Sequence, residues 1–479
     1  NMIKPKFPCI VIFVIVAALN FILTAIDLTG QPRIRFESTN TPNEVVASAN
    51  PSLPHSQREE NLGNSISLSQ IGRKDSRRLS LLSQYADPQS KETKPSALET
   101  HDMKILSLGT SQTWGVNLTN RESEAYPRLL SPVAKNLAMR AMGPKYPALC
   151  AQSLIGEEQY DIITLEFIGG GQRIPDLGML AGRLRERFPD AIIIFVKIWY
   201  PRQIQIRDQN DEWIYLGTYF EKHGVEDWKN ELLNLKQSQL RYEVIPGYTG
   251  DDMFHKIVES VGGYVYQMPQ LNDALNHLLE YKDWWLDDMH HISLDGHKEV
   301  ARGVKEVFEH ARDSYKSEPR LGTWGEGDQC DTWYTSGQCS LPRSDNLVVK
   351  PFDKQMTKFA IDIGDMARGG SVKVNNPFDS PRTLFIGYMV INPLPSPYPR
   401  TSVAAGQNRS MILEQTSQNF AFPVHVMVLK NFGLISPGET TLHFLPLEEG
   451  GNPFRLTSIS IVGQSQADKK IEDLFYDDA

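Results

Sequence analysis

The stretch YDIITLEFI, Tyr160 to Ile168, is rich in β-branched residues and is suited to a strand that is buried on both faces. The stretch DLGMLAGRLRERF at 176–188 has helical spacing, and Pro189 ends it. A second buried strand, AIIIFVKIW, follows at 191–199. Strand, helix and strand in this order predict a parallel sheet that helices cover on both sides.

The same alternation continues on both sides of this unit, from residue 101 to about 317. Further strand candidates are MKILSL (103–108) and YVYQM (264–268), and further helical patterns occupy 225–240, 251–262 and 295–315. We therefore expect one α/β domain over 101–320. Ligands bind at the carboxyl ends of the strands in such sheets, and Ser111 comes just after the first strand.

The pattern changes beyond a connector at 321–345 that contains two of the cysteines. Short strand-like runs separated by Pro, Gly, Asn and Asp follow without helical patterns between them, among them KFAIDIG, SVKVNN, TLFIGYMVI and LTSISIVG. They predict a C-terminal all-β sandwich over 346–470, followed by an acidic tail at 471–479.

The N-terminal residues predict a membrane anchor. Lys4 and Lys6 precede roughly twenty mostly apolar residues, from Phe7 to Ile26, which as a helix would span roughly 30 Å. The positive charges favour a cytoplasmic tail, so residues 1–27 predict a signal anchor of a single-pass type II membrane protein of the secretory pathway. A cleaved signal peptide and a buried helix are the alternatives. The polar segment 28–100 is expected to be a disordered stem.

Composition and cysteines agree with a luminal or extracellular location. The net charge is −9 and no basic domain stands out, which argues against a nucleic-acid partner. Cys330 and Cys339 bracket the short polar loop CDTWYTSGQC, and we expect them to form a disulfide, with two free thiols as the alternative. Asn117 and Asn408 begin glycosylation sequons. No metal or organic cofactor is implied.

A serine becomes a nucleophile when a base takes its proton and a third group orients that base. The stretch DDMHH supplies the candidates immediately before the last helix of the α/β domain. A D-x-x-H spacing lets the carboxylate fold back onto the imidazole of its own turn. Two registers fit this spacing: Asp287 with His290, or Asp288 with His291.

Two blocks resemble the SGNH (GDSL-like) family of esterases and lipases. ILSLGTSQTWG resembles its first block, a strand followed by G-D-S-x-T-x-G, and DDMHHISLDGH resembles its last block, D-x-x-H followed by x-S-x-x-G and a helix. The offsets of Ser293 and Gly296 select the second register. The resemblance covers about 101–317.

This resemblance implies a flavodoxin-like three-layer fold and a catalytic triad. Ser111 takes the place of the nucleophile, His291 that of the general base and Asp288 that of the carboxylate that orients the base. The family's oxyanion hole implies backbone N–H groups of Ser111 and Gly143. The family's third block supplies an asparagine, but this chain has LEFIGGGQR there, so we expect a glycine such as Gly170 to substitute. Thr110 also stands where the family has the Asp of G-D-S.

Each of these residues also has a structural interpretation. Ser111 is also suited to a turn or a helix cap, and Gly143 to an ordinary turn. His291 is also suited to cap the last helix or bond the backbone, and Asp288 to be a capping or solvated acid. His297 is expected to be structural. Trp284 and Trp285 are expected to pack in the core, with a sugar platform as the alternative.

The sequence predicts a serine esterase, acyl hydrolase or O-acyltransferase that acts on acyl esters. O-acylated glycans are the candidate substrates, a suggestion that rests on the expected location and on fold-level analogy. The alternative is a catalytically degenerate membrane protein that binds a glycan or a protein, which the missing asparagine favours. A structural role of the β-sandwich is a third hypothesis.

Overall fold

The structure is a computed structural model that describes most of the chain beyond residue 102. The described ranges are 103–167, 174–207, 212–237, 242–243, 251–269, 274–312, 321–325, 329–392, 398–406, 409–414, 424–448 and 452–463. The expected signal anchor (1–27), stem (28–100) and acidic tail (471–479) lie outside these ranges. Within the described ranges, no helix combines the length and the apolar character needed to cross a membrane.

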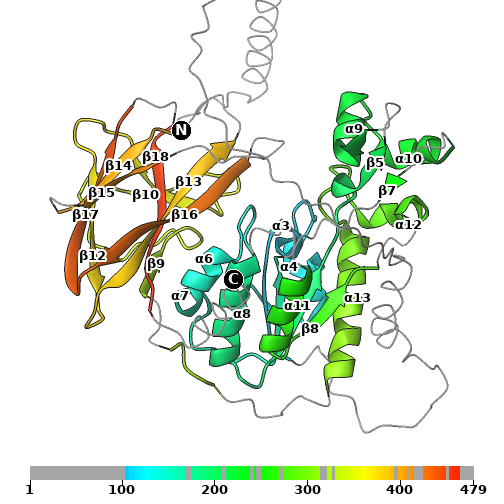
Figure 1. Cartoon of the computed structure of the whole chain (residues 1–479), viewed down its shortest axis with the longest axis horizontal. Helices are drawn as coiled ribbons and strands as arrows, with labels where there is room; N and C mark the ends of the chain where they lie inside the picture. The colour runs from blue at the N-terminus through cyan, green and yellow to red at the C-terminus, as the bar shows by residue number, and fades with distance from the viewer. Residues whose placement is uncertain are drawn as a thin grey trace, which may run out of the picture. The chain divides into compact units, whose positions relative to one another are not determined.

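A five-stranded parallel sheet forms the centre of the first domain (Figure 1). Its strand order is β2-β1-β3-β4-β8, and every neighbouring pair is parallel. The strands are β1 (Ile105–Gly109), β2 (Lys135–Asn136), β3 (Ile162–Glu166), β4 (Ile192–Lys197) and β8 (Tyr264–Gln267). This is the flavodoxin-like order, and it confirms the parallel α/β domain that the buried runs predict.

Successive side chains of a strand point to opposite faces of the sheet, so these apolar strands present apolar side chains on both faces, and helices cover both of them. On β4, Ile192, Ile194 and Val196 belong to the apolar core that includes residues of α13 (Leu294–Ala311). Ile193 and Phe195 belong to the other core, which includes residues of α8 (Ile174–Arg187) and α11 (Asp251–Ser260). Burying one such Ile or Phe side chain, rather than leaving it in water, stabilises the folded state by roughly 1.5–3 kcal/mol.

An insertion between β4 and β8 carries a small antiparallel sheet of its own. Its order is β6-β5-β7, with β5 (Gln205–Arg207), β6 (Trp213–Tyr215) and β7 (Tyr242–Glu243). Its helices are η3 (Pro201–Gln203), α9 (Leu216–Lys222) and α10 (Trp228–Gln237). The helix α12 (Ala274–Tyr281), which follows β8 in the chain, packs against α10 and β7, and η4 (Lys282–Trp284) comes directly after it. The strands are two or three residues long, which is too short for an alternating pattern to be recognised in the sequence.

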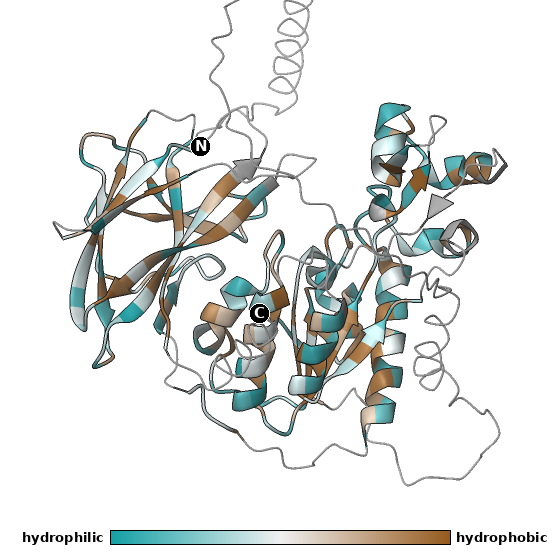
Figure 2. Ribbon diagram, in the orientation of Figure 1, coloured by the Kyte–Doolittle hydropathy of each residue, from teal (hydrophilic) through white to brown (hydrophobic). Residues whose placement is uncertain are grey.

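The C-terminal domain consists of antiparallel sheets that enclose an apolar core, as the sequence predicts. One sheet has the order β10-β11-β18-β13-β16, with β9 paired to β18, and the other has the order β12-β17-β14-β15. The alternating hydropathy along these strands is visible in Figure 2. The strands are β9 (Gln329–Thr332), β10 (Val349–Pro351), β11 (Phe359–Ile363), β12 (Gly370–Asn376), β13 (Arg382–Asn392), β14 (Thr401–Ala405), β15 (Arg409–Leu413), β16 (Val424–Ile435), β17 (Gly438–Pro446) and β18 (Phe454–Ile461).

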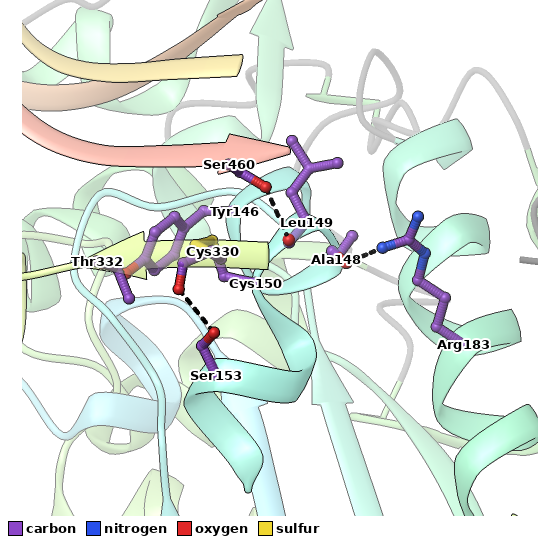
Figure 3. Close-up of a disulfide and its surroundings, with 9 residues drawn as sticks. All are labelled: Tyr146, Ala148, Leu149, Cys150, Ser153, Arg183, Cys330, Thr332 and Ser460. Atoms are coloured by element: carbon purple, nitrogen blue, oxygen red, sulfur yellow. Dashed lines mark hydrogen bonds between the residues drawn. A yellow bond between two sulfur atoms is a disulfide. The ribbon is translucent and has the colours of Figure 1, made fainter. Parts of the chain in front are cut away.

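The disulfide joins the two domains, and the pairing expected from the sequence is wrong. Cys150 and Cys330 are bonded (Figure 3). Cys339 is a free, half-buried thiol. Cys330 lies on β9, in the segment expected to be a connector, and β9 is paired with β18. That pairing brings Cys330 to the junction of α6 (Lys145–Leu149) and α7 (Ala151–Ile155), where the Ser153 hydroxyl donates to its carbonyl oxygen at 2.7 Å. A partner 180 residues away has no local signature.

Replacing both Cys150 and Cys330 by serine should lower the free energy of unfolding by about 2–5 kcal/mol, because the crosslink closes a very long loop. Cys339→Ser is the matched control and should change stability little. Denaturant unfolding measures both effects, and peptide mapping without reductant identifies the bond. A crosslink between Cys330 and Cys339 would contradict this assignment.

Candidate active site

Ser111 begins the one-turn helix α3 (Ser111–Trp114), directly after β1. Thr110, not Ser111, caps this helix: its hydroxyl oxygen accepts from the Gln112 N–H. Gly115 ends the helix in the left-handed region at φ 83°, where a glycine carries no steric cost. The hydroxyl of Ser111 is therefore not needed as a helix cap.

The structure brings Ser111, His291 and Asp288 together. Ser111 Oγ lies 3.0 Å from His291 Nε2, and His291 Nδ1 lies 2.6 Å from Asp288 Oδ2. The other carboxylate oxygen, Asp288 Oδ1, accepts the backbone N–H of His291 at 2.8 Å and that of His290 at 3.0 Å. Met289 takes a positive φ of 56°, which closes this tight turn.

The second register, Asp287 with His290, is not assembled. The Asp287 side chain is 93% exposed and lies 4.0 Å from Lys229 Nζ. The His290 ring stacks on Tyr200, with ring centroids 4.7 Å apart. Burial lowers the pKa of His290 to about 4, so this imidazole is neutral at physiological pH.

The charge state of Asp288 determines which nitrogen of His291 carries hydrogen. Burial raises the pKa of Asp288, but hydrogen bonds from the side chain and backbone of His291 and from the His290 N–H outweigh it and lower the pKa to about 2. The ionised carboxylate accepts only, so Nδ1 carries the hydrogen. Nε2 is then free to accept the hydroxyl proton of Ser111.

Glu166 lies at the carboxyl end of β3 and holds the turn that carries Ser111. The sequence did not predict it as a site residue. Its Oε2 accepts hydrogen bonds from Thr110 N at 2.9 Å, Thr110 Oγ1 at 2.8 Å and Thr113 Oγ1 at 3.1 Å. The carboxylate that binds Thr110 therefore comes from β3, the strand next to β1 in the sheet. An acidic residue in a mostly apolar, buried strand is the sequence signal for it.

The pH dependence of stability should reveal this carboxylate. Burial raises the pKa of Glu166 from its ordinary 4.5 to about 7, although its hydrogen bonds oppose the shift. The folded state then binds the proton more tightly than the unfolded state, so the stabilising contribution is complete below pH 4.5 and disappears as the pH rises through 7.

Between pH 4.5 and 7, the free energy of unfolding of the wild type should therefore fall by roughly 3 kcal/mol relative to Glu166→Gln, because each unit of pKa shift corresponds to about 1.4 kcal/mol. Urea unfolding of both proteins at several pH values measures this difference. Parallel pH profiles would contradict the prediction.

The loop that carries Gly143 begins beside Ser111. The Leu137 N–H donates to Ser107 O at 2.9 Å, and the Met139 N–H donates to Gly109 O at 3.0 Å. These bonds extend the pairing with β1 to its carboxyl end, so the loop starts next to the nucleophile turn. Gly143 lies four residues further on, whereas Gly170 lies outside the described residues.

The β-sandwich holds this loop through Arg140. Arg140 Nη2 donates to Asp353 Oδ2 at 2.9 Å, and Lys358 Nζ donates to the Arg140 carbonyl oxygen at 3.0 Å. The Arg140 guanidinium also lies 4.5 Å from the ring centroid of Trp114, the last residue of α3. The second domain therefore contacts the loop that begins beside Ser111 and carries Gly143.

The remaining candidates are placed as follows. His297 is buried, its Nδ1 accepts the Tyr126 N–H at 3.2 Å, and burial lowers its pKa to about 3, which fits the structural role expected for it. Trp285 is fully buried in the core, and Trp284 stacks on Tyr281 with ring centroids 4.1 Å apart. Asn117 is exposed, and Asn408 lies outside the described residues.

A polar groove of about 390 Å³ has Asp287, the residue before Asp288, in its wall, but its lining residues do not include Ser111, Asp288 or His291. Lys229 Nζ lies 3.8 Å from Asp283 Oδ1 and 4.0 Å from Asp287 Oδ1. The residues that line the groove are all polar or charged: Glu226, Asp227, Lys229, Asn230, Lys282 and Asp287.

Comparison with known proteins gives distant structural likenesses. No family model matches the sequence, and no curated protein matches it. Among solved structures, a two-domain esterase active on acetylated mannans has a TM-score of 0.46 at 11% identity, over 76% of this chain and 92% of that one. The esterase EstA from Pseudoalteromonas sp. has a TM-score of 0.29 at 12% identity, over 44% of this chain and 100% of that one. TesA has a TM-score of 0.28 at 12% identity, over 43% and 99%. Scores below 0.5 leave the activity to be argued from the chain's own residues.

Proposed function

We propose that the chain is a serine esterase or O-acyltransferase of the SGNH type. Ser111 is the nucleophile, His291 the general base and Asp288 the carboxylate that orients His291. The observation that carries this proposal is the 3.0 Å separation of Ser111 Oγ and His291 Nε2, with Asp288 at 2.6 Å on the other ring nitrogen. A hydroxyl, a base and an orienting acid in this chain of contacts is the arrangement that activates serine.

The reaction proceeds in two balanced steps. Ser111 Oγ bonds to the acyl carbon while its proton passes to His291 Nε2, and the imidazolium is stabilised by Asp288. The tetrahedral oxyanion collapses, the alcohol leaves with the proton from His291, and an acyl group remains on Ser111. Water or a second alcohol then attacks the acyl carbon as its proton passes to His291 Nε2. When this second tetrahedral intermediate collapses, the acyl group leaves on the new oxygen, and His291 returns the proton to Ser111 Oγ, which restores the free serine.

Two backbone N–H groups are proposed for the oxyanion, those of Ser111 and Gly143. Gly170 is proposed as the substitute for the family's asparagine. In a serine protease, loss of one oxyanion-hole donor lowers kcat about 10²–10³-fold. If Gly170 supplies no N–H to the oxyanion, we therefore expect a slow enzyme rather than an inactive one.

The polar groove that includes Asp287, the residue before Asp288, supports an acyl ester of a hydroxyl-rich molecule as the substrate. Lysine, carboxylate and carboxamide groups line it, and these donate to and accept from sugar hydroxyls. Pockets for long acyl chains are lined mainly by apolar side chains. O-acetylated glycans are therefore the substrates we propose.

A luminal or extracellular location is part of the proposal. A disulfide between Cys150 and Cys330 suits an oxidising compartment, and the exposed Asn117 sequon suits a glycoprotein. The apolar segment from Phe7 to Ile26 is proposed as the signal anchor.

Acetate release by the purified chain tests the function. We expect turnover of p-nitrophenyl acetate and of an acetylated oligosaccharide, and much slower turnover of p-nitrophenyl palmitate. The alternative is a degenerate protein that binds a glycan without turnover, and the missing asparagine is the observation that favours it. Calorimetric binding of the acetylated oligosaccharide with no acetate release would support that alternative.

A further inference from the structure

Gln112 makes contacts that neither the triad nor the oxyanion hole requires. It follows Ser111 directly on α3, and its side chain is 1% exposed. Its Oε1 accepts the Ile292 N–H at 2.9 Å, and its Nε2 donates to the His290 carbonyl oxygen. The two peptide groups that it binds belong to the residues immediately before and after His291.

The orientation of this carboxamide follows from its partners. A backbone N–H only donates and a carbonyl oxygen only accepts, so Oε1 must face Ile292 and Nε2 must face His290. A single side chain thus connects the neighbour of the nucleophile to both neighbours of the base, across about 180 residues of sequence.

The other contacts described for the His291 loop are internal or lead to the segment after β4, where the Arg202 N–H donates to Met289 O at 3.2 Å and Tyr200 stacks on His290. None of these contacts connects the loop to α3. Leu286 N–H donates to His291 O at 2.8 Å, and Trp285 and Ile292 form an antiparallel bridge that closes the loop. Asp288 also belongs to this loop. Apart from the Ser111–His291 contact itself, the bonds described between α3 and this loop are those of Gln112.

We infer that Gln112 is a positioning residue that sets the separation of Ser111 Oγ and His291 Nε2. This inference rests on the proposed function. Without the carboxamide, the buried Ile292 N–H and His290 carbonyl lose their partners and the loop must shift to find others. A misplacement of about 1 Å in a catalytic pair costs on the order of 10²-fold in rate.

Gln112→Met tests the inference, because methionine matches the length of the side chain but forms neither bond. We expect kcat for p-nitrophenyl acetate to fall about 10²-fold, with KM within about threefold of the wild type. A purely structural role would lower the melting temperature and leave kcat unchanged when the assay is run well below that temperature.

Asn376→Leu is the matched control. Asn376 is another buried carboxamide, 2% exposed, and it binds Ser380 O, Ile435 O and the Phe378 N–H within the β-sandwich. Its replacement should lower the melting temperature but keep kcat within about twofold of the wild type. A kcat of Gln112→Met that is equally unchanged would overturn the inference.

Gln112→Glu serves if the methionine variant does not fold. It keeps the acceptor for Ile292 and loses the donor to His290, so kcat should fall about tenfold, and full activity would overturn the inference.

A crystal structure of the folded Gln112 variant decides the same point without turnover. We expect the Ser111 Oγ–His291 Nε2 distance to exceed 3.5 Å, the limit for a hydrogen bond, or His291 to occupy two positions. An unchanged 3.0 Å distance would overturn the inference. If the wild type hydrolyses no ester, the proposed function fails while this readout still tests the role of Gln112.

Discussion

Ser111→Ala is expected to lower kcat/KM for p-nitrophenyl acetate by at least about 10⁴-fold, because the acyl-enzyme cannot form without the hydroxyl. Stability should change little, since Thr110 caps α3. Initial rates at saturating and limiting ester, with melting temperatures for both proteins, measure the effect.

Two controls sharpen this prediction. Ser123 is an exposed serine on the nearby helix α4 (Arg121–Glu124), where its hydroxyl donates to Asn120 O at 3.3 Å, and Ser123→Ala should leave the rate unchanged. The double variant Ser111→Ala/His291→Ala should be no slower than the single variant, because members of one catalytic unit are not additive. Substantial activity in Ser111→Ala would mean that another group attacks the ester.

Asp288→Asn is expected to lower kcat about 10⁴-fold through the wrong tautomer of His291. The new carboxamide oxygen continues to accept the backbone N–H groups of His290 and His291, so the loop should keep its shape. Its NH₂ group faces Nδ1, which must then accept, and the imidazole hydrogen moves to Nε2. A protonated Nε2 cannot take the proton of Ser111.

Asp287→Asn is the matched control for this change, since the neighbouring carboxylate is 93% exposed and 4.0 Å from Lys229. Its kcat for a small ester should stay within about threefold of the wild type. The pKa of Asp288, about 2, keeps its carboxylate ionised through the assay range, so the loss in Asp288→Asn should not be restored at any pH from 5 to 9. A large loss in Asp287→Asn with a small one in Asp288→Asn would assign the pair to the other register.

The parallel sheet could be predicted because its signals are local. β3 and β4 are completely buried, so most residues on both of their faces are apolar and the runs are nearly continuous in the sequence. β2 has two residues, and β5 to β7 have two or three, so no periodicity marks them. The β-sandwich was recognisable from short strand-like runs separated by Pro, Gly, Asn and Asp without helical patterns between them, such as the run that forms β12 (Gly370–Asn376).

The same distinction separates the site residues that could be predicted from those that could not. Asp288 and His291 lie three residues apart, so the D-x-x-H spacing identifies them in the sequence. The roles of Gln112 and Glu166 depend on partners 178 and 56 residues away, and no spacing rule links such positions. The partner of Cys330 was missed for this reason too, since strand pairing and not loop length brings Cys150 to it.

The most direct test of the central claim is labelling with a fluorophosphonate, which reacts with a serine only when a neighbouring base activates it. Peptide mass spectrometry after labelling of the wild type should find one phosphonate, on Ser111, and labelling should be lost in both Ser111→Ala and His291→Ala. A wild-type protein that is folded but unlabelled, or labelled at another serine, would contradict the account.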